Sequence, residues 1–524
     1  MHSEAPSEFV DREIARQSQR KKRRKIILFR TFGLFLLGFL TFAPLLKSGF
    51  LWNVYSESDQ SLILKVEDLS SIWSIDAIRR YDPISRTSFY AEQVFLKNPA
   101  TVHRAINITL HLVAALLLWS LLKRLKLSSA FWPSLLFAVH PAVIQTIFWP
   151  GYRYELIGTI LMLSALSIYL SKLNSITYLI SILITIITLL VHPLALLIPI
   201  IATLAICNRD FPAKLKHLNP MLPVFCICSL LGTYLANIDP GYIFSQTVAN
   251  WTWQAGRTFQ FFLQQTFNPG AIKVFEALNP QVNFSLSAGI NLLPFLVFPP
   301  LFALGIGFRK KPWARSLIFG LLLFLLFLIP IIFLPSKFID GSIVLDTHRF
   351  YPALMIIVVL AFFSVRRTLQ KLEIVSNKVQ RITLGFTLLA FSILSFQFSY
   401  SISKPHELWR TLASQRPESW KANLTYIELA IINDANNLKT ESFILSLQGL
   451  LEDQPENLRI RKLLARTYMK IDQTNNALRE YRRAFRDGVE DPEFIEEAIL
   501  LFKTYNLEWD AENAKERLES IPLN

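Results

Sequence analysis

Long apolar segments are the feature that most constrains this chain. They recur throughout the first 400 residues, and several approach the roughly 20 residues that a helix needs to cross a bilayer. Of the 524 residues, 52% are hydrophobic and 18% are charged, whereas soluble domains contain about 25% charged residues. This composition excludes a disordered, collagenous or disulfide-built protein, and it argues against an ordinary cytosolic enzyme.

The apolar segments predict about eleven transmembrane helices, so the predicted fold class is all-α. Their approximate ranges are 27–46, 104–122, 128–147, 155–171, 175–190, 193–207, 218–237, 288–307, 315–334, 350–365 and 382–402. The stretch 253–268 is amphipathic and aromatic, which predicts either a helix on the membrane surface or a further partial span. The first apolar run lacks a small-residue cleavage site, so it predicts an uncleaved anchor.

The distribution of charge predicts how these helices are oriented. Residues 1–402 contain 37 basic and 18 acidic side chains, whereas residues 403–524 contain 17 and 21. The basic run at 20–25 directly precedes the first span, and basic loops of membrane proteins face the cytoplasm. Eleven alternations then place four further basic segments on that side, at 123–126, 209–216, 309–315 and 366–381.

Three parts of the chain follow from this orientation. They are a basic cytoplasmic segment over 1–26, a membrane domain over 27–402 with a large non-cytoplasmic loop at 47–103, and a non-cytoplasmic tail over 403–524. Basic runs beside membrane helices, without aromatic stacking platforms, argue against a nucleic-acid partner. The cysteine-free tail favours a bacterial inner membrane with the tail in the periplasm, and an endoplasmic-reticulum membrane is the alternative.

The tail has the pattern of amphipathic helices with charged faces. One segment matches a tetratricopeptide repeat, a 34-residue helical hairpin, at Leu464, Ala465, Tyr468, Ala477, Tyr481 and Ala484. Weaker matches flank it on both sides. Stacks of such repeats bind peptides or proteins on a concave face, so the tail predicts a protein-binding domain. A short helical cap that covers the membrane domain is the alternative.

Charged residues at the outer ends of the spans are the candidates for chemistry, because charge within or beside a bilayer is expensive. Dinucleotide, Walker, zinc-protease and paired-cysteine motifs do not occur in the sequence. Arg153 and Glu155 begin one span, where they form either a functional pair or an interfacial ion pair. Arg349 opens a later span and is suited to a phosphate, because its fork donates two parallel hydrogen bonds; an interfacial anchor is the alternative.

Several histidines also map to the helix ends and faces of this region. His192 precedes a proline that breaks a long apolar run, which predicts a hairpin at the outer face, and His140 precedes another proline near the same face. His111 follows Asn107 by four residues, so the two polar groups lie on one helical face as functional groups or as contacts between helices.

The long loop contributes most of the acidic residues of the membrane domain. They are Glu57, Asp59, Glu67, Asp68, Asp76, Asp82 and Glu92. Most of these side chains are expected to be solvated loop charges, so a role for any one of them needs further context.

Several motifs follow one another in the order of a known family. The series comprises Tyr81-Asp82-Pro83-Ile84-Ser85-Arg86, Asn107-Ile108-Thr109-Leu110-His111, Leu135 to Pro141, Arg153-Tyr154-Glu155 and Arg349-Phe350-Tyr351-Pro352, and a repeat tail closes it. The chain thereby resembles the transmembrane and tetratricopeptide-repeat protein O-mannosyltransferases of the GT-C superfamily. The resemblance covers nearly the whole chain, and residues 102–170 are its most specific part.

Membership would imply a multi-spanning enzyme that transfers a sugar from a polyprenyl-phosphate-linked donor at the non-cytoplasmic face. The acceptor would be a Ser or Thr hydroxyl of an exported protein, recruited by residues 403–524, or a glycan or lipid. Glu155 matches the second acidic position of the family, and Arg349 matches the arginine near the lipid phosphate. His192 replaces the lysine that is often found near the fifth-to-sixth span turn.

The first-loop acidic pair of the family is altered in this chain. One alignment places Asn53-Val54 at these positions and removes the base, whereas another places Ser58-Asp59 there and retains one carboxylate. The second alignment predicts Asp59 and Glu155 as catalytic residues. The predicted lipid-phosphate and donor-binding residues are Arg349, Arg153, His140 and His192. A divalent metal ion would be a further cofactor, although hard cations need several oxygen ligands and only one acid is certain.

Two other interpretations are left open by the sequence. The missing acidic pair is also expected of a catalytically inactive relative that acts as a membrane scaffold or assembly protein through its repeat domain. A transporter is the third interpretation, but few charges lie at mid-membrane and no internal repeat is evident.

Overall fold

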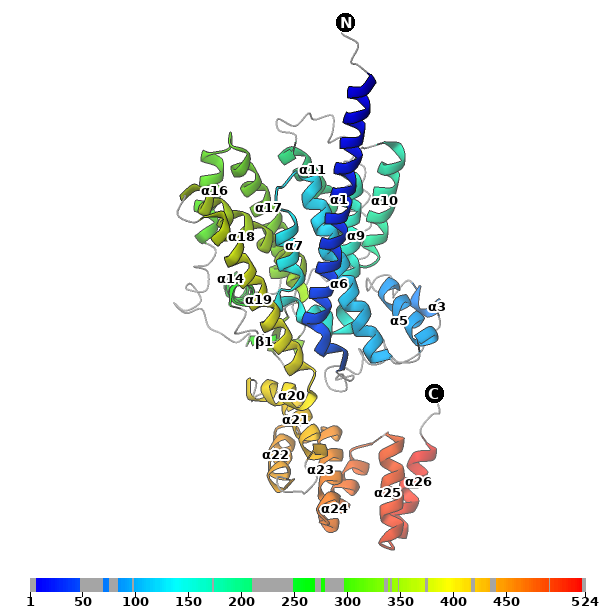
Figure 1. Ribbon diagram of the computed structural model, residues 1–524. Helices are drawn as coiled ribbons and strands as arrows, with labels where there is room; N and C mark the ends of the chain where they lie inside the picture. Colours follow the sequence, from blue (N-terminus) through cyan, green and yellow to red (C-terminus); the bar gives the residue numbers. More distant parts are fainter. Residues whose placement is uncertain are drawn as a thin grey trace. The chain divides into compact units, whose positions relative to one another are not determined.

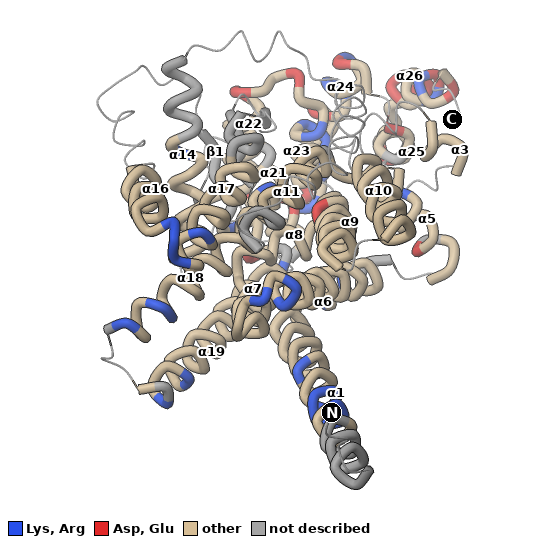
Figure 2. Tube along the Cα trace, turned by 90° about the horizontal axis from the view of Figure 1, so that it is seen from above, with Lys and Arg blue, Asp and Glu red and all other residues tan. Residues whose placement is uncertain are grey.

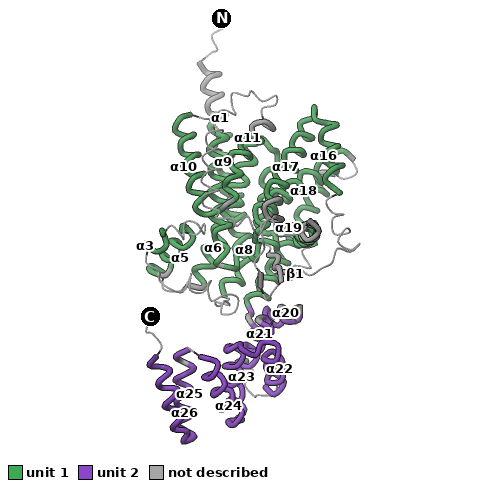
Figure 3. Tube along the Cα trace, turned by 180° about the vertical axis from the view of Figure 1, so that it is seen from behind, with its two compact units in different colours: residues 1–50, 57–403 green, residues 51–56, 404–524 purple. Residues whose placement is uncertain are grey.

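The computed structural model describes residues 6–47, 69–74, 83–96, 99–171, 174–209, 248–268, 275–278, 296–333, 338–339, 342–346, 348–372, 376–415, 420–433, 440–489 and 491–520. The described residues divide at Ser403 into two compact units (Figure 3). We call the described residues up to 403 the bundle unit and those from 404 onward the tail unit.

The bundle unit is built from helices that run side by side (Figure 1). Its α-helices are α1 (Pro6–Phe42), α3 (Leu69–Ile72), α5 (Pro83–Leu96), α6 (Pro99–Arg124), α7 (Phe131–Ala138), α8 (Ile144–Phe148), α9 (Arg153–Tyr169), α10 (Ser175–Leu189), α11 (Ile198–Arg209), α14 (Val248–Phe267), α16 (Phe298–Gly307), α17 (Pro312–Phe333), α18 (Tyr351–Leu372) and α19 (Asn377–Ile402). Short 3₁₀ turns lie at Ala43–Lys47, Pro141–Val143, Pro150–Tyr152, Pro193–Leu197 and His348–Phe350.

Four helical segments of the described chain are long and apolar enough to cross a membrane. They are Gln17–Lys47, Thr101–Arg124, His348–Lys371 and Lys378–Ile402. A fifth is added if the bent pair Phe131–Ala138 and Pro141–Phe148 forms one span. The membrane character expected from the sequence is confirmed at this level. The count of eleven spans stays a prediction, and the predicted span 218–237 lies outside the described residues.

The predicted span 128–147 is interrupted rather than continuous. Its two helices meet at an angle of 54°, and the break lies at Val139–His140. Pro141 explains the interruption, because proline has no N–H to donate and its ring clashes with the preceding helical turn. The same His-Pro sequence at His192 separates α10 from the 3₁₀ turn that leads into α11, as predicted from the apolar pattern.

Helix α10 has its polar side chains inside and its apolar side chains outside. Ser181, Thr185 and Thr188 are buried, and each hydroxyl donates to a backbone carbonyl. Leu179 and Leu183 are 55% and 50% exposed. A helix in water has the reverse arrangement, whereas lipid solvates apolar side chains and leaves hydroxyls to bond within the protein.

One small antiparallel sheet interrupts the otherwise helical described structure. Its strands are β1 (Phe275–Leu278), β2 (Phe338–Ile339) and β3 (Ser342–Asp346), in the order β1-β3-β2. Phe275 pairs with Asp346, and Phe338 pairs with Ile343. The all-α expectation did not include this sheet. The pairing of β1 with β3 thus joins two segments that are far apart in the sequence.

Basic residues gather at one end of the bundle unit. Seen from the end at which α1 begins, Figure 2 shows lysines and arginines on α1, α18 and α19 and between α16 and α17. The Arg367 guanidinium and the Lys371 ammonium lie 5.0 and 5.3 Å from the centre of the Trp313 ring, which joins the end of α18 to the start of α17. The assignment of this basic end to the cytoplasm stays a prediction.

The tail unit consists of seven helices within the described residues. They are α20 (Pro405–Gln415), α21 (Trp420–Asn433), α22 (Thr440–Asp453), α23 (Leu458–Lys470), α24 (Thr474–Arg486), α25 (Pro492–Thr504) and α26 (Glu508–Glu519). Helices α22, α24 and α26 begin 34 residues apart. All six residues singled out for the best repeat are buried in one apolar core. The positions chosen from sequence are therefore core positions of helical hairpins.

Candidate functional site

Glu155 lies in the first turn of α9, where the partial positive charge of a helix N-terminus favours a carboxylate. The side chain is buried, and its Oε2 lies 2.8 Å from Nε2 of His192. The other ring nitrogen of His192, Nδ1, accepts from the backbone N–H of Leu194 at 3.1 Å. Because Nδ1 accepts, the proton of a neutral ring is on Nε2, and His192 donates to Glu155. The sequence proposed both residues but not their pairing.

Gly158 allows this pair to form. Gly158 lies about one helical turn after Glu155 in α9. A Cβ atom at Gly158 would lie only 2.6 Å from Cβ of His192. Only a residue without a side chain permits the His192 turn to approach α9 so closely.

Aromatic rings bring a third segment to the same place. The rings of Tyr152 and His348 stack with their centres 3.5 Å apart and their planes 8° apart. The ring of Tyr154 lies 5.7 Å from His192 and 6.3 Å from His348. Segments that are far apart in the sequence, around residues 152, 192 and 348, therefore converge. We call Tyr152, Tyr154, Glu155, His192 and His348 the polar cluster.

Two further predicted positions border the polar cluster. Arg349 is half-buried in the 3₁₀ turn that contains His348. Tyr351 follows two residues later, and its hydroxyl lies 2.7 Å from Nδ1 of His111. Nε2 of His111 donates to the Ala138 carbonyl at 3.1 Å, so Nδ1 accepts the Tyr351 proton. His111 is thus a link between α6 and α18, which fits the predicted role in contacts between helices.

Arg153 forms an ion pair with a carboxylate that the sequence reasoning did not select. Its guanidinium pairs with Glu92 of α5 and not with Glu155. The Arg153 Nε also donates to Asn107 Oδ1 at 2.8 Å, and Nη1 donates to Ser88 at 3.0 Å. The expected Arg153–Glu155 pair is corrected accordingly. The two charges lie on opposite sides of the start of α9, because residues two apart in a helix do not face each other.

Glu92 has a second partner, His103 of α6. Arg153 and His103 are completely buried, and Glu92 is nearly so. Burial opposes ionisation of Glu92, but the hydrogen bonds and charges of His103 and Arg153 outweigh it and hold the pKa of the Glu92 carboxyl below its ordinary value. We call Ser88, Glu92, His103, Asn107 and Arg153 the buried ion-pair network. Two signals for it were present in the sequence: Asn107, a polar residue within an apolar span, and Arg153, a charge at the start of another span.

His140 contacts other residues than those of the polar cluster. Its Nδ1 accepts from the Ala142 N–H at 3.1 Å, and its Nε2 donates to the Thr266 carbonyl at 3.2 Å. The ring packs edge-on against Phe391. Both nitrogens are used in bonds that hold the break between α7 and α8, and none of the contacts among the described residues joins His140 to Glu155.

The remaining predictions concern the first-loop acid and a metal ion. Asp59, like Asn53, lies outside the described residues. Within the described ranges, no group of three or more His, Cys, Asp or Glu side chains could hold a metal ion.

No protein family, curated protein or solved structure matches the chain.

Proposed function

We propose that this protein is a membrane glycosyltransferase that uses a polyprenyl-phosphate-linked sugar, with the polar cluster as its reaction centre. The observation that carries the proposal is the buried Glu155–His192 pair, together with the stacking of Tyr152 on His348, the residue that precedes Arg349. Apolar helices around the cluster suit a lipid-borne donor, because a polyprenyl chain needs a hydrocarbon environment.

The proposed reaction assigns one role to each residue. The acceptor oxygen forms a bond to the anomeric carbon as the bond from that carbon to the phosphate oxygen breaks. The acceptor proton passes to the Glu155 carboxylate, which His192 holds in place through its Nε2–H. The bonding electron pair leaves with the polyprenyl phosphate, whose charge Arg349 stabilises. The tail unit would recruit the protein acceptor, as stacked helical hairpins do.

Activity of the full-length protein tests the proposal. The purified protein in lipid is supplied with polyprenyl-phosphate and polyprenyl-diphosphate sugars and an extract of exported proteins, and release of the lipid phosphate is measured. We expect Glu155→Gln to lower turnover by about 10²- to 10⁴-fold, as for loss of a general base. The matched control Glu441→Gln changes an exposed residue of α22 and should retain turnover. Equal activity of wild type and Glu155→Gln would reject Glu155 as the base.

A scaffold function is the second candidate, and one observation favours it. Glu155, Arg153 and His140 are buried and bonded to partners within the protein, as expected of groups that hold helices together. A scaffold would release no lipid phosphate from any donor. It would also co-purify with a partner that is lost when residues 404–524 are deleted.

A further inference from the structure

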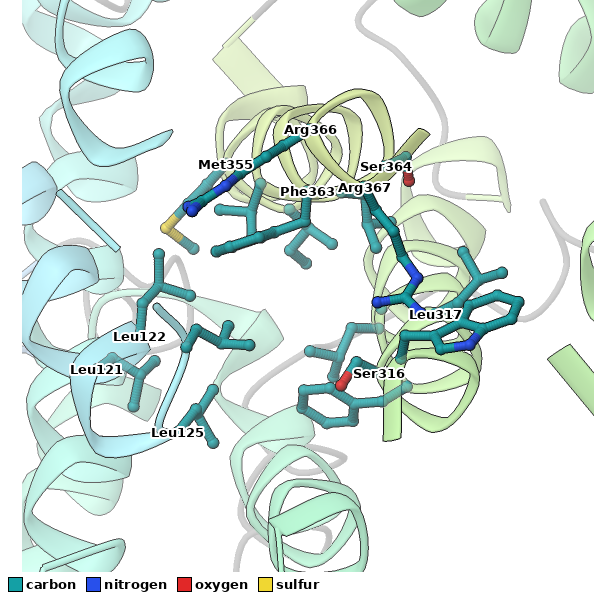
Figure 4. A pocket seen from close by; sticks show the side chains of 18 of the residues that line it. Leu121, Leu122, Leu125, Ser316, Leu317, Met355, Phe363, Ser364, Arg366 and Arg367 are labelled. Carbon is teal, nitrogen blue, oxygen red and sulfur yellow. The ribbon is translucent and has the colours of Figure 1, made fainter. Parts of the chain in front are cut away.

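The bundle unit contains a large apolar cavity at its basic end. The cavity has a volume of about 810 Å³ and lies between α6, α9, α17 and α18. Figure 4 shows Leu121 and Leu122 of α6 on one wall and Met355 and Phe363 of α18 on another. None of the described residues that line the cavity is acidic. An enclosure of this size and polarity is typical of a site for an apolar ligand.

Three positively charged side chains lie at one end of this cavity. Arg366, Arg367 and Lys371 lie in the last turns of α18 and line the cavity together with Trp313. Figure 4 shows the side chains of Arg366 and Arg367 extending from α18 toward the cavity. Within the described part of the chain, none of these three cations forms an ion pair with a carboxylate. No carboxylate of the described residues therefore neutralises these three positive charges.

The apolar part of the cavity lining on α18 is about as long as one leaflet of a bilayer is thick. The lining of the cavity on α18 extends from Met355 to Lys371, and Met355 lies eleven residues before Arg366, the first of the cations. At a rise of 1.5 Å per residue this is about 16 Å. The hydrocarbon core of a bilayer is about 30 Å thick, so one leaflet measures about 15 Å. Trp313 at the same end suits the membrane–water interface, where tryptophan is enriched.

We propose that this cavity binds an anionic phospholipid from the leaflet at the basic end. One acyl chain occupies the apolar part, and the headgroup phosphate is bound by Arg366, Arg367 and Lys371. Basic pockets between membrane helices recognise anionic headgroups through this combination. The site is distinct from the polar cluster, because Tyr351, beside that cluster, lies fifteen residues or about 22 Å from Arg366 along α18. The proposal does not depend on glycosyltransferase activity.

The lipids retained by the full-length protein test this proposal. The protein is delipidated and reconstituted with vesicles of equal phosphatidylglycerol and phosphatidylcholine plus a small fraction of polyprenyl phosphate, and retained lipids are identified by native mass spectrometry. We expect one phosphatidylglycerol to be retained over phosphatidylcholine by about tenfold or more, since each nearby cation attracts an anionic lipid. The triple variant Arg366→Gln/Arg367→Gln/Lys371→Gln should bring this preference to near parity.

Two matched variants distinguish lipid binding in the cavity from attraction of anionic lipid by surface charge in general. The triple variant Arg309→Gln/Lys310→Gln/Lys311→Gln removes the same charge from exposed positions that do not line the cavity, and should keep the preference. Val359→Trp keeps all charges but fills the middle of the cavity, and should abolish retention of the lipid. Equal loss in both triple variants would overturn the proposal. Retention of polyprenyl phosphate in place of phosphatidylglycerol would also overturn it.

Discussion

Helices α10 and α24 expose opposite kinds of side chain to their surroundings. In α24, Ala477 and Tyr481 are buried, whereas Arg479 and Arg482 are exposed. In α10, the hydroxyl of Thr185 is buried and Leu183 is half-exposed. In each helix the exposed side chains are of the kind that the surrounding solvent would stabilise: apolar side chains in lipid and charged side chains in water. The contrast teaches that the outward-facing residues, rather than the core, distinguish a helix in lipid from a helix in water.

The ion pairs of the two units differ in the same way. Arg153 and Glu92 of the bundle unit are buried, whereas Arg482 pairs with Asp510 of the tail unit at 2.6 Å while its side chain is 45% exposed. A buried pair loses its hydration, so removal of one partner leaves an uncompensated charge. The exposed pair can exchange its partner for water.

We therefore expect the largest difference from removal of these arginines. Arg153→Ala should lower the free energy of unfolding of the bundle unit by about 3–5 kcal/mol, because the buried Glu92 carboxylate loses its arginine partner and keeps only His103. Arg482→Ala should lower that of the tail unit by about 0–1 kcal/mol. Hydrogen exchange of peptides from each unit measures both values. The double variant Arg153→Met/Glu92→Gln should recover much of the loss. Similar losses for both single variants would contradict the contrast in burial.

A lysine placed on an exposed leucine tests the solvent directly. Leu183→Lys on α10 should destabilise the bundle unit in lipid by about 2.5–3.5 kcal/mol, since a charge in a bilayer is expensive. Leu445→Lys on α22 replaces a leucine that is 69% exposed, and should change the stability of the tail unit by less than about 0.5 kcal/mol. The same hydrogen-exchange measurement applies. If both substitutions were neutral, the exposed face of α10 would be in water.

Two glycines extend the comparison to the proposed site. Gly158→Ala should destabilise the bundle unit by about 1–3 kcal/mol, because the added methyl group would displace His192 from Glu155. Lipid-phosphate release should fall as well. Gly449 of α22 has no neighbour within 4 Å of an added Cβ, so Gly449→Ala should stabilise the tail unit by about 0.5–1 kcal/mol. Unchanged activity in Gly158→Ala would show that the His192–Glu155 contact is dispensable.

The smallest expected effect is a pH dependence confined to the bundle unit. Because the folded pKa of Glu92 is lowered from 4.5, this carboxylate contributes stability above its unfolded pKa. That contribution should be lost as the pH falls below about 4.5 and through the folded pKa. Stability curves of wild type and Glu92→Gln should therefore converge at acidic pH. Parallel curves would show that Glu92 does not contribute in this way.

Helix positions followed closely from the sequence, because they depend on local patterns. The predicted spans 104–122 and 382–402 each lie within a described helix, and 27–46 lies within the helical segment Gln17–Lys47, which ends in a 3₁₀ turn. The break at His192 lies where the proline interrupts the apolar run. The core residues of the best hairpin were identified for the same reason, since a 34-residue period fixes which faces meet. The interruption at His140 was missed, although Pro141 marks it, because the segment 128–147 has the length and the apolar composition of one span.

The site was only partly predictable, because its contacts join distant segments. Glu155, His192 and Arg349 were selected from helix ends and their charge, and the structure brings their segments together through the stacked rings of Tyr152 and His348. Glu92 could not be distinguished from the other acids of its loop, because its role depends on how α5 packs against α6 and α9.

The sequence alone determined that the chain has bilayer-length apolar helices, a basic first part and an acidic tail with a hairpin period. These properties are sums or short-range patterns along the chain. Only the tertiary structure decided that Arg153 pairs with Glu92, that His192 donates to Glu155, and that the cations of α18 stand over an apolar cavity. Such choices depend on distances between segments up to hundreds of residues apart, and the packing of whole helices sets those distances.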